Sequence, residues 1–403
     1  MELFWLEHKK LWRKKIVKIC VLLCFVYYVI FGSILSFQWF CFGSSDDYTS
    51  AFGNNFDGYT VIKDSQEYAL SFGGELTDET LQKIVSDYQQ MEADGMEEEL
   101  EKTDWQIVNS WLGTLYPELR DTSNYKTMIS YVDPDKLTGF YERRQQVLDE
   151  FLEVSGQVGA EKEFLHQIER KVEKPFRYEW VEGWSTLLGS MVADLGVVMA
   201  LFLGIVLSSL FAGEWHDNTS TLVLTTRNGW GKIALAKILT GLAFTVELFA
   251  LLAVSNVISQ LFFMGTAGWD MPIQNIKLIA VAPMNMLQAE IYEYAFVLLG
   301  AIGFAGIVMF ISAAVKNNVL TLLLSLAVVY GPMMIAEYLP YKMQKALDLI
   351  PLVGSSTDIF RTNTFRILGK LIWSPYLLIT IPVLIGILCM PFAIKSWSRR
   401  MKA

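Results

Sequence analysis

The fold is decided by residues 184–213, WSTLLGSMVADLGVVMALFLGIVLSSLFAG, whose only charged side chain is Asp194. A helix needs about 20 mostly apolar residues to cross the hydrocarbon core of a bilayer, and this stretch is long enough. Five further windows pass the same test, and the only charge among them is Glu247: residues 20–42, 238–268, 295–315, 319–336 and 371–394. The sequence therefore predicts an all-α membrane protein with six transmembrane helices.

The composition agrees with a membrane protein that also carries a water-facing domain. Hydrophobic residues make up 53% of the chain and aromatic residues 13%, which is too apolar for an ordinary soluble protein. The net charge of -9 is unevenly spread, because residues 43–185 hold 30 acidic and 13 basic side chains while the remainder is net positive. This segregation predicts an acidic soluble domain and a basic membrane face at the lipid bilayer, and it argues against a nucleic-acid partner.

The distribution of basic residues predicts the orientation. Six bases precede the first apolar window, between Lys9 and Lys18, and the next base in the chain is Lys63. By the positive-inside rule the N-terminus is cytoplasmic and residues 43–185 are extracellular. Residues 395–403 are also basic, which predicts a cytoplasmic tail. This topology places residues 340–370 outside, although they contain five bases. The charge rule therefore does not determine the topology of the last third of the chain.

The chain divides into five parts on this reading. Trp5, Trp12 and Ile16 form one stripe of a helix whose other faces carry lysines, so we expect a cytoplasmic interfacial helix over residues 1–18. No small-x-small cleavage site follows the first apolar run, so residues 19–42 are expected to be an uncleaved first transmembrane helix. Three parts follow: the acidic extracellular domain over residues 43–185, transmembrane helices two to six over residues 186–394, and the cytoplasmic tail over residues 395–403.

The extracellular domain is expected to be mainly helical. Its candidate helices have apolar residues at helical spacing, and the first has Thr77 as its N-cap. An aromatic cluster, which includes Trp180 and Trp184, precedes the second span and is expected to seat the domain in the headgroup layer. The candidate helices are residues 76–91, 104–115, 134–154 and 160–172.

Signatures of enzyme chemistry are missing from the sequence. The three histidines, His8, His166 and His216, are far apart, and there is no HExxH pattern or Cys/His grouping with metal-ligand spacing. There is no GxxxxGK[ST] phosphate loop either. We therefore expect no catalytic residues, metal or cofactor in this chain. The four cysteines lie in or at the edge of apolar spans, which gives no disulfide framework, and a bacterial origin fits best.

The informative motif follows the second span, in residues 210–227, LFAGEWHDNTSTLVLTTR. An apolar helix ends at a Glu, a polar step with an Asn-Thr pair follows, a Leu-rich segment leads to an Arg, and a Lys opens the next span. The pattern and the order of parts resemble the permeases of type-2 ABC exporters, although Thr225 and Thr226 stand where that family usually has Pro or Ser. The resemblance implies an ATPase-coupling loop over residues 214–232, with roles for Glu214, Asn218, Thr219, Leu222, Arg227, Lys232 and Lys237.

The resemblance also implies the function. The chain would be the multi-pass permease subunit of an exporter in a bacterial cytoplasmic membrane, with re-entrant external helices over residues 340–370. A separate ATPase subunit would bind ATP and Mg, and a second permease, identical or related, would complete the pathway with spans two and five at the seam. The acidic external domain favours cationic peptides or antimicrobial compounds as substrates.

Charged side chains inside the membrane are costly, so they are candidates for function. Asp194 and Glu247 either line a substrate path or make hydrogen bonds between helices. Glu290 and Glu293 open the fourth span and are either functional candidates as well or residues of the headgroup layer. The small residues Gly300, Gly303 and Gly306 favour close packing of helices over substrate contact.

An alternative function is a membrane receptor, or a sensor and assembly scaffold, whose extracellular domain binds a ligand. Such a protein needs a cytoplasmic output region, and the predicted inner segments are all short. This favours the exporter subunit.

Overall fold

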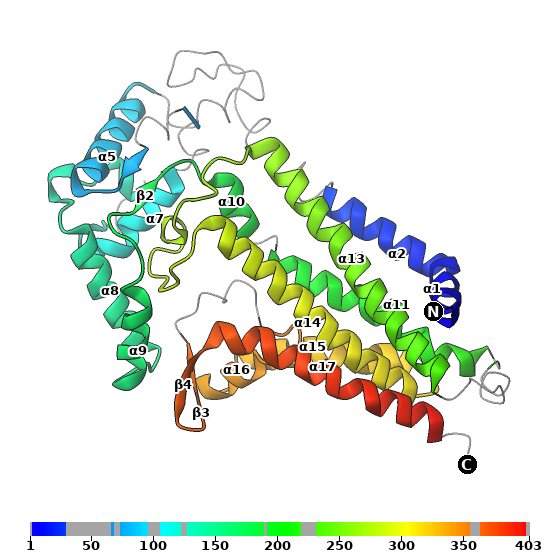
Figure 1. Ribbon diagram of the computed structural model, residues 1–403. Coiled ribbons are helices and arrows are strands. Elements are labelled where there is room, and N and C mark those ends of the chain that lie inside the picture. Colours follow the sequence, from blue (N-terminus) through cyan, green and yellow to red (C-terminus); the bar gives the residue numbers. More distant parts are fainter. Residues whose placement is uncertain are drawn as a thin grey trace.

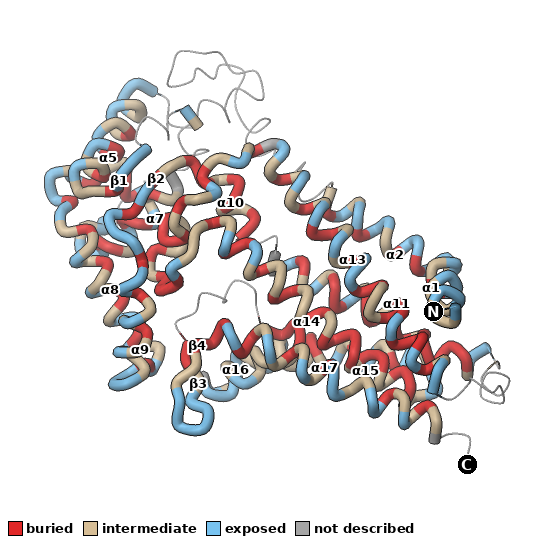
Figure 2. Tube along the Cα trace, in the orientation of Figure 1, coloured by how far each residue is buried: buried red, intermediate tan, exposed pale blue. Residues whose placement is uncertain are grey.

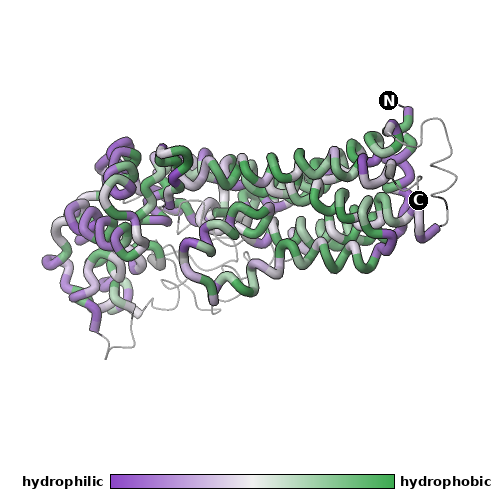
Figure 3. The backbone as a smooth tube through the Cα atoms, turned by 90° about the horizontal axis from the view of Figure 1, so that it is seen from below, coloured by the Kyte–Doolittle hydropathy of each residue, from purple (hydrophilic) through white to green (hydrophobic). Residues whose placement is uncertain are grey.

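The computed structural model describes residues 2–29, 66–67, 73–95, 105–121, 127–188, 192–217, 219, 231–354 and 363–399. Long helices form a bundle, and a group of shorter helices lies at one end of it, opposite the end where both chain termini lie (Figure 1). Figure 3 shows hydrophilic residues gathered in the group of short helices and a hydrophobic stretch along the bundle. This division matches the charge segregation of the sequence.

Five helices of the bundle are long and apolar enough to cross a membrane. They correspond to the second to sixth predicted spans, so the mainly helical, multi-pass character is confirmed at this level. Part of the remaining predicted span, residues 19–42, lies in α2 (Lys15–Val26), and its second half falls outside the described residues. The five helices are α11 (Val192–His216), α13 (Lys232–Met264), α14 (Met286–Ala314), α15 (Asn318–Ala336) and α17 (Ser374–Arg399).

Helix α14 is the centre of the bundle, and two of its glycines bring it against α17. A Cβ on Gly303 would lie 2.3 Å from the carbonyl oxygen of Pro382, and one on Gly306 would lie 2.5 Å from that of Gly386. These distances leave no room for any side chain, so the glycines allow the two backbones to touch. The predicted small-residue stripe is a packing surface, with Gly300 placed against Leu352.

Helices α11 and α14 are mostly buried, whereas α15 leaves most of its surface open (Figure 2). The most hydrophobic window of α15 is only 17% buried, against 61% for the windows of α11 and α14. Exposed side chains on α15 include Val319, Leu323 and Met334. An apolar helix with so much open surface needs lipid or another protein around it.

The predicted interfacial helix is shorter than expected. Helix α1 (Glu2–Arg13) ends before Lys14, and α2 starts immediately after it, so Ile16 belongs to α2 and not to the predicted stripe. Trp5 is exposed, while Trp12 packs edge-on against Phe244 of α13, with ring centroids 5.7 Å apart. Helix α1 therefore lies against α13 through part of the predicted apolar stripe only.

The domain that follows contains the predicted helices with small shifts. Thr77 caps the first, its Oγ1 accepting a hydrogen bond from the backbone N–H of Thr80 at 3.2 Å. The third predicted helix is divided at Gly139, which has a left-handed backbone, and its first part is a separate turn, η4 (Pro134–Lys136). The helices are α5 (Asp78–Ala93), α7 (Trp105–Leu115), α8 (Phe140–Val154) and α9 (Ala160–Glu169), with short turns η2 (Pro117–Leu119), η3 (Met128–Ser130) and α10 (Glu182–Thr186).

Two small antiparallel strand pairs were not predicted. Strand β1 (Gly74–Glu75) pairs with β2 (Arg177–Tyr178), and β3 (Thr364–Ile367) forms a hairpin with β4 (Lys370–Trp373). Within residues 340–370 the prediction of re-entrant helices is therefore partly wrong. The segment begins with the short helix α16 (Tyr341–Leu347), but its end is a β-hairpin that turns at Leu368 and Gly369, both with positive φ.

Buried polar contacts hold the domain to the segment between α13 and α14. The Arg144 side chain is fully buried, pairs with Glu169 at 2.6 Å, and donates hydrogen bonds to the carbonyl oxygens of Leu278 and Ala280 at 2.7 and 3.1 Å. Because one guanidinium serves both parts, Arg144 fixes the domain on this segment.

The aromatic cluster before α11 is also part of this junction, and its predicted place at the headgroup layer is wrong. Trp184 donates from Nε1 to the carbonyl oxygen of Ala267 at 3.0 Å, and Trp180 donates to that of Met264 at 3.3 Å. The rings pack inside the protein because residues 264–268 supply the acceptors that the headgroup layer was expected to supply. The four cluster side chains, Phe176, Tyr178, Trp180 and Trp184, are 5% exposed or less.

The Arg144–Glu169 pair predicts how the domain responds to acid. Burial alone would raise the pKa of Glu169, but the hydrogen bonds and charges of Lys174 and Arg144 lower it below its usual value. A Glu whose pKa is lower in the folded state than in the unfolded state, where it is about 4.3, stabilises the fold at pH values above about 4.3. This contribution is lost as the pH falls from there through the folded-state pKa. We expect acid unfolding, followed by circular dichroism, to depend less on pH in Glu169→Gln, with exposed Glu150→Gln as the unchanged control. Parallel pH profiles for wild type and Glu169→Gln would contradict this.

Candidate functional site

The candidate site lies where α11 ends and α13 begins, at the end of the bundle that carries both termini. Most of the predicted coupling loop joins these two helices, and of residues 218–230 the structure describes only Thr219. The predicted coupling residues Asn218, Leu222 and Arg227 therefore lie outside the described residues. Lys232 is the first residue of α13 and is exposed.

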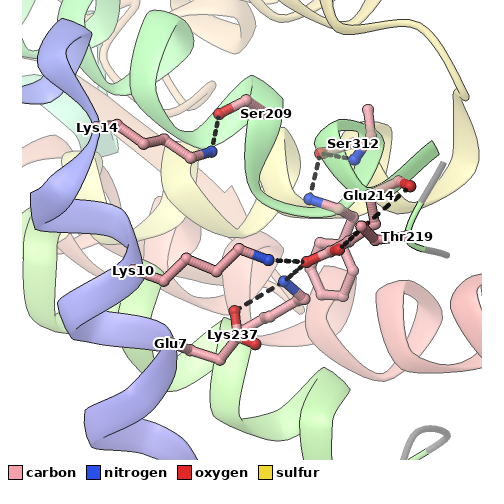
Figure 4. Close-up of polar contacts among 10 residues, drawn as sticks. Glu7, Lys10, Lys14, Ser209, Glu214, Thr219, Lys237 and Ser312 are labelled. Atoms are coloured by element: carbon pink, nitrogen blue, oxygen red, sulfur yellow. Dashed lines mark hydrogen bonds and ion pairs between the residues drawn. The ribbon is translucent and has the colours of Figure 1, made fainter. Parts of the chain in front are cut away.

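Glu214 is the centre of an ionic network, named here the inner-end network: Glu7, Lys10, Glu214, Thr219 and Lys237 (Figure 4). The Glu214 side chain is only 4% exposed. Its Oε1 accepts hydrogen bonds from Lys10 Nζ of α1 at 2.6 Å and from Lys237 Nζ of α13 at 2.7 Å. Its Oε2 accepts one from the hydroxyl of Thr219. One carboxylate thus joins α1, α11, α13 and the start of the loop.

Lys237 is the second buried charge of the network. Its side chain is 2% exposed and also pairs with Glu7 Oε2 of α1 at 2.8 Å. The two lysines and two glutamates balance in charge; Glu214 and Lys237 are buried, whereas the Lys10 side chain is 50% exposed. Burial acts to lower the pKa of Lys10, but Glu214 outweighs it and the pKa is raised. Lys10 is therefore held in its charged form.

Two further polar contacts anchor the network. Lys14, at the break between α1 and α2, donates to Ser209 Oγ of α11 at 2.9 Å. Burial, and then the charges of Lys237 and Lys10, lower its pKa. The Ser312 hydroxyl of α14 donates to the Ser208 carbonyl oxygen at 2.7 Å and accepts from two backbone N–H groups of the last turns of α11. The end of α11 is thus held from both sides.

The arrangement of these side chains joins helices and can transmit movement between them. Removing one partner from a buried ion pair costs about 3–5 kcal/mol, because the other charge stays buried without compensation. The network therefore allows α1, α11 and α13 to move together and resists their separation. Among the described residues, no group of three or more His, Cys, Asp or Glu could hold a metal ion.

The intramembrane charges have different surroundings. Glu247 of α13 faces α1, accepting from Trp12 Nε1 at 3.0 Å and lying 3.2 Å from His8 Nε2. Of the two interpretations of Glu247, the contact between helices is therefore the one that the structure supports. Asp194 is exposed at the start of α11, and the Tyr27 hydroxyl lies 3.5 Å from it.

Glu290 and Glu293 lie near the start of α14 and are buried in the protein. They are 3% and 1% exposed, because the domain junction and the neighbouring helices cover the first turns of α14. Neither carboxyl makes a well-formed hydrogen bond with a described residue.

Sequence reasoning found Glu214, Thr219 and Lys237 but missed their partners on α1. Glu7 and Lys10 lie 230 and 204 residues away from the residues they bind, so no local pattern connects them. A signal was present in α1 itself. Glu7 and Lys10 share one helical face with buried Leu11, at spacings typical of a contact surface. A charged face around a buried residue indicates an ionic partner elsewhere in the chain.

Comparison of the chain with models of protein families, with curated proteins and with solved structures found no significant match.

Proposed function

We propose that this chain is the transmembrane permease subunit of an ATP-driven exporter, coupled to a separate ATPase. The observation that carries the proposal is the inner-end network. Its buried carboxylate, Glu214, holds the base of the predicted coupling loop to α1 and to α13. An ATPase that moves this loop needs such a rigid attachment, because otherwise the movement would deform only the loop and would not reach the helices.

The proposed mechanism transmits force through this base. The ATPase binds ATP and Mg and docks on the predicted coupling loop, residues 214–232, using the apolar side chains of the loop as anchors. Movement of the loop then shifts α11 and α13 as a unit, because Glu214 and Lys237 join them. Helix α1 moves with them through Lys10 and Glu7.

The proposed assembly contains a second permease, identical or related, in a bacterial cytoplasmic membrane. The bundle offers half of a pathway, and the open apolar surface of α15 is available for a neighbour or for lipid. The acidic domain between α2 and α11 is placed outside, where its charge favours cationic peptides or antimicrobial compounds as substrates.

A first test concerns ATP hydrolysis. The purified chain is expected to hydrolyse no ATP, because its sequence has no phosphate-binding loop. Hydrolysis is expected when an ATPase subunit is co-expressed and co-purified. The measurement is phosphate release by the chain alone and by the complex. Stoichiometric turnover by the single chain would contradict the assignment of a subunit.

A second test concerns orientation. Asp94→Cys at the end of α5 and Lys232→Cys at the start of α13 both place a cysteine at an exposed position. In a background without the native cysteines, a membrane-impermeant maleimide on intact cells is expected to label position 94 and spare position 232. The reverse pattern would show that the topology is inverted.

A pocket at the domain junction favours a second candidate, a receptor that binds a ligand there. It has a volume of about 340 Å³ and is lined by side chains of both signs, including Lys171, Glu173, Arg177 and Asp270. Pockets for small molecules start at about this size. A receptor would work without an ATPase, so signalling that persists after deletion of every ATPase partner would favour it.

A further inference from the structure

Glu290 and Glu293 are the least compensated charged groups of the bundle. They lie one helical turn apart on α14. No described basic side chain forms an ion pair with either; Lys277 acts on Glu293 only from a longer distance. An isolated carboxylate buried away from water is so costly that such groups neutralise or hold a cation.

A second, independent observation is the polar face that α13 presents to them. Asn256 Nδ2 donates to the Tyr294 hydroxyl at 2.9 Å, and this bond fixes how α13 and α14 face each other. The two helices are antiparallel. One turn from Asn256 along α13 is Gln260, and one turn back from Tyr294 along α14 is Glu290, so these two residues lie at the same level of the bundle.

Gln260 is another polar residue buried at the level of the carboxyl pair. It is 1% exposed, and neither its Nε2 nor its Oε1 has a hydrogen-bond partner among the described residues. The Oδ1 atom of Asn256, which is fully buried, also has none. Unpaired polar groups thus gather at this level of the bundle from two helices, and none of these amide groups carries a positive charge.

The other groups around the pair are uncharged. The Tyr294 hydroxyl lies beside the Glu290 carboxyl, and Tyr28 approaches Tyr294 from the end of α2. Tyr292 lies near Glu293, but its hydroxyl donates to the carbonyl oxygen of Pro375. Two ionised carboxylates would place two negative charges here with no basic side chain of the described residues paired to them, whereas a proton on one removes a charge and turns that carboxyl into a donor.

We propose that Glu290 and Glu293 form a proton-binding site between α13 and α14, in which the pair holds at least one proton at neutral pH. Asn256, Gln260 and Tyr294 line the site. Ionisation of both carboxyl groups requires water, so loss of the proton separates α13 from α14 at this level. The assignment concerns the chain itself and does not depend on the proposed transport function.

The test is infrared spectroscopy of the purified full chain. The carbonyl absorption of protonated carboxylic acids is expected at pH 7 in the wild type and is expected to be lost in the Glu290→Gln/Glu293→Gln double variant. Glu247→Gln is the matched control, since Glu247 is partly exposed and bonded to α1. Its spectrum is expected to keep the band. Absence of the band in the wild type, or its survival in the double variant, would overturn the proposal.

A second measurement distinguishes a proton from a metal cation and does not require the variants to fold equally well. The unfolding temperature of the wild type is expected to fall as the pH is raised from about 4.3, the pKa of a glutamate in an unfolded chain, until the site itself ionises, because over this range the folded site keeps a proton that the unfolded chain has lost. Replacing sodium by choline at constant ionic strength is expected to change nothing. Stabilisation of the wild type by sodium, lost in the double variant, would assign the site to a metal cation and overturn the proton.

Discussion

Glu214→Ala is expected to release α1 from the bundle and to abolish coupled transport while the chain still inserts into the membrane. The substitution leaves Lys237 buried with only Glu7 as its counter-charge and removes the acceptor of Lys10. Loss of one partner from a buried pair costs about 3–5 kcal/mol, and the remaining Glu7 reduces this. The expected readouts are a lower unfolding midpoint, faster proteolysis of α1, and loss of transport in proteoliposomes with retained ATPase binding.

Two variants serve as controls. Asp217→Ala removes an exposed carboxylate just beyond α11 whose partner is the exposed His216, and it is expected to have no effect. Glu214→Gln is expected to be milder than Glu214→Ala, because the amide keeps one oxygen acceptor of similar shape. Wild-type stability and transport in Glu214→Ala at equal expression would show that the inner-end network contributes neither to stability nor to coupling.

A double-mutant cycle separates the ion pair from mere packing. Lys237→Met alone is expected to be as damaging as Glu214→Ala, since Glu214 then keeps only Lys10. Glu214→Ala combined with Lys237→Met is expected to be milder than the sum of the two single changes, because the charges that remain, Glu7 and Lys10, are of opposite sign and both partly exposed. Strict additivity would contradict a direct coupling of the two charges.

Gly303→Ala and Gly306→Ala are expected to have the second large effect, on the stability of the bundle. An added methyl group would collide with the backbone at Pro382 or Gly386, and backbone atoms cannot rotate away as a flexible side chain can. Overpacking of this kind costs about 1–3 kcal/mol. The measurement is the unfolding midpoint of purified variants in detergent.

Gly331→Ala is the matched control for this prediction. Gly331 is also helical, in α15, but a Cβ there would meet no atom within 4 Å. Alanine is favoured over glycine in a helix by about 0.5–1 kcal/mol, so this change is expected to be neutral or stabilising. Equal effects at Gly303 and Gly331 would show that α14 and α17 are not in backbone contact.

Local patterns predicted much of the fold. Apolar windows with at most one charged residue located all five described helices that could span a membrane, and the periodicity of Leu81, Ile84, Val85 and Tyr88 located the buried face of α5. The hairpin β3–β4 was missed because the resemblance to exporters suggested helices there. Its own sequence contained a signal, the Gly369 turn between short runs with β-branched and aromatic residues.

The candidate site was only half predictable, because its contacts are long-range. The sequence marked Glu214 and Lys237 at the ends of two spans, but it contained no indication that Lys10 and Glu7 meet them. For Glu290 and Glu293 the position in the sequence suggested the membrane surface, and only the fold shows that other parts of the chain cover them. Burial by distant segments is a tertiary property that periodicity does not report.

The most direct test of the permease account is ATP hydrolysis by the co-purified complex in proteoliposomes, measured with and without substrate for wild type and Glu214→Ala. We expect substrate to stimulate hydrolysis in the wild type and to leave the hydrolysis of Glu214→Ala, with its ATPase still bound, at the basal rate. Equal stimulation in both would contradict a role of the inner-end network in coupling. A wild-type chain that retains no ATPase from its native membrane would contradict the permease assignment itself.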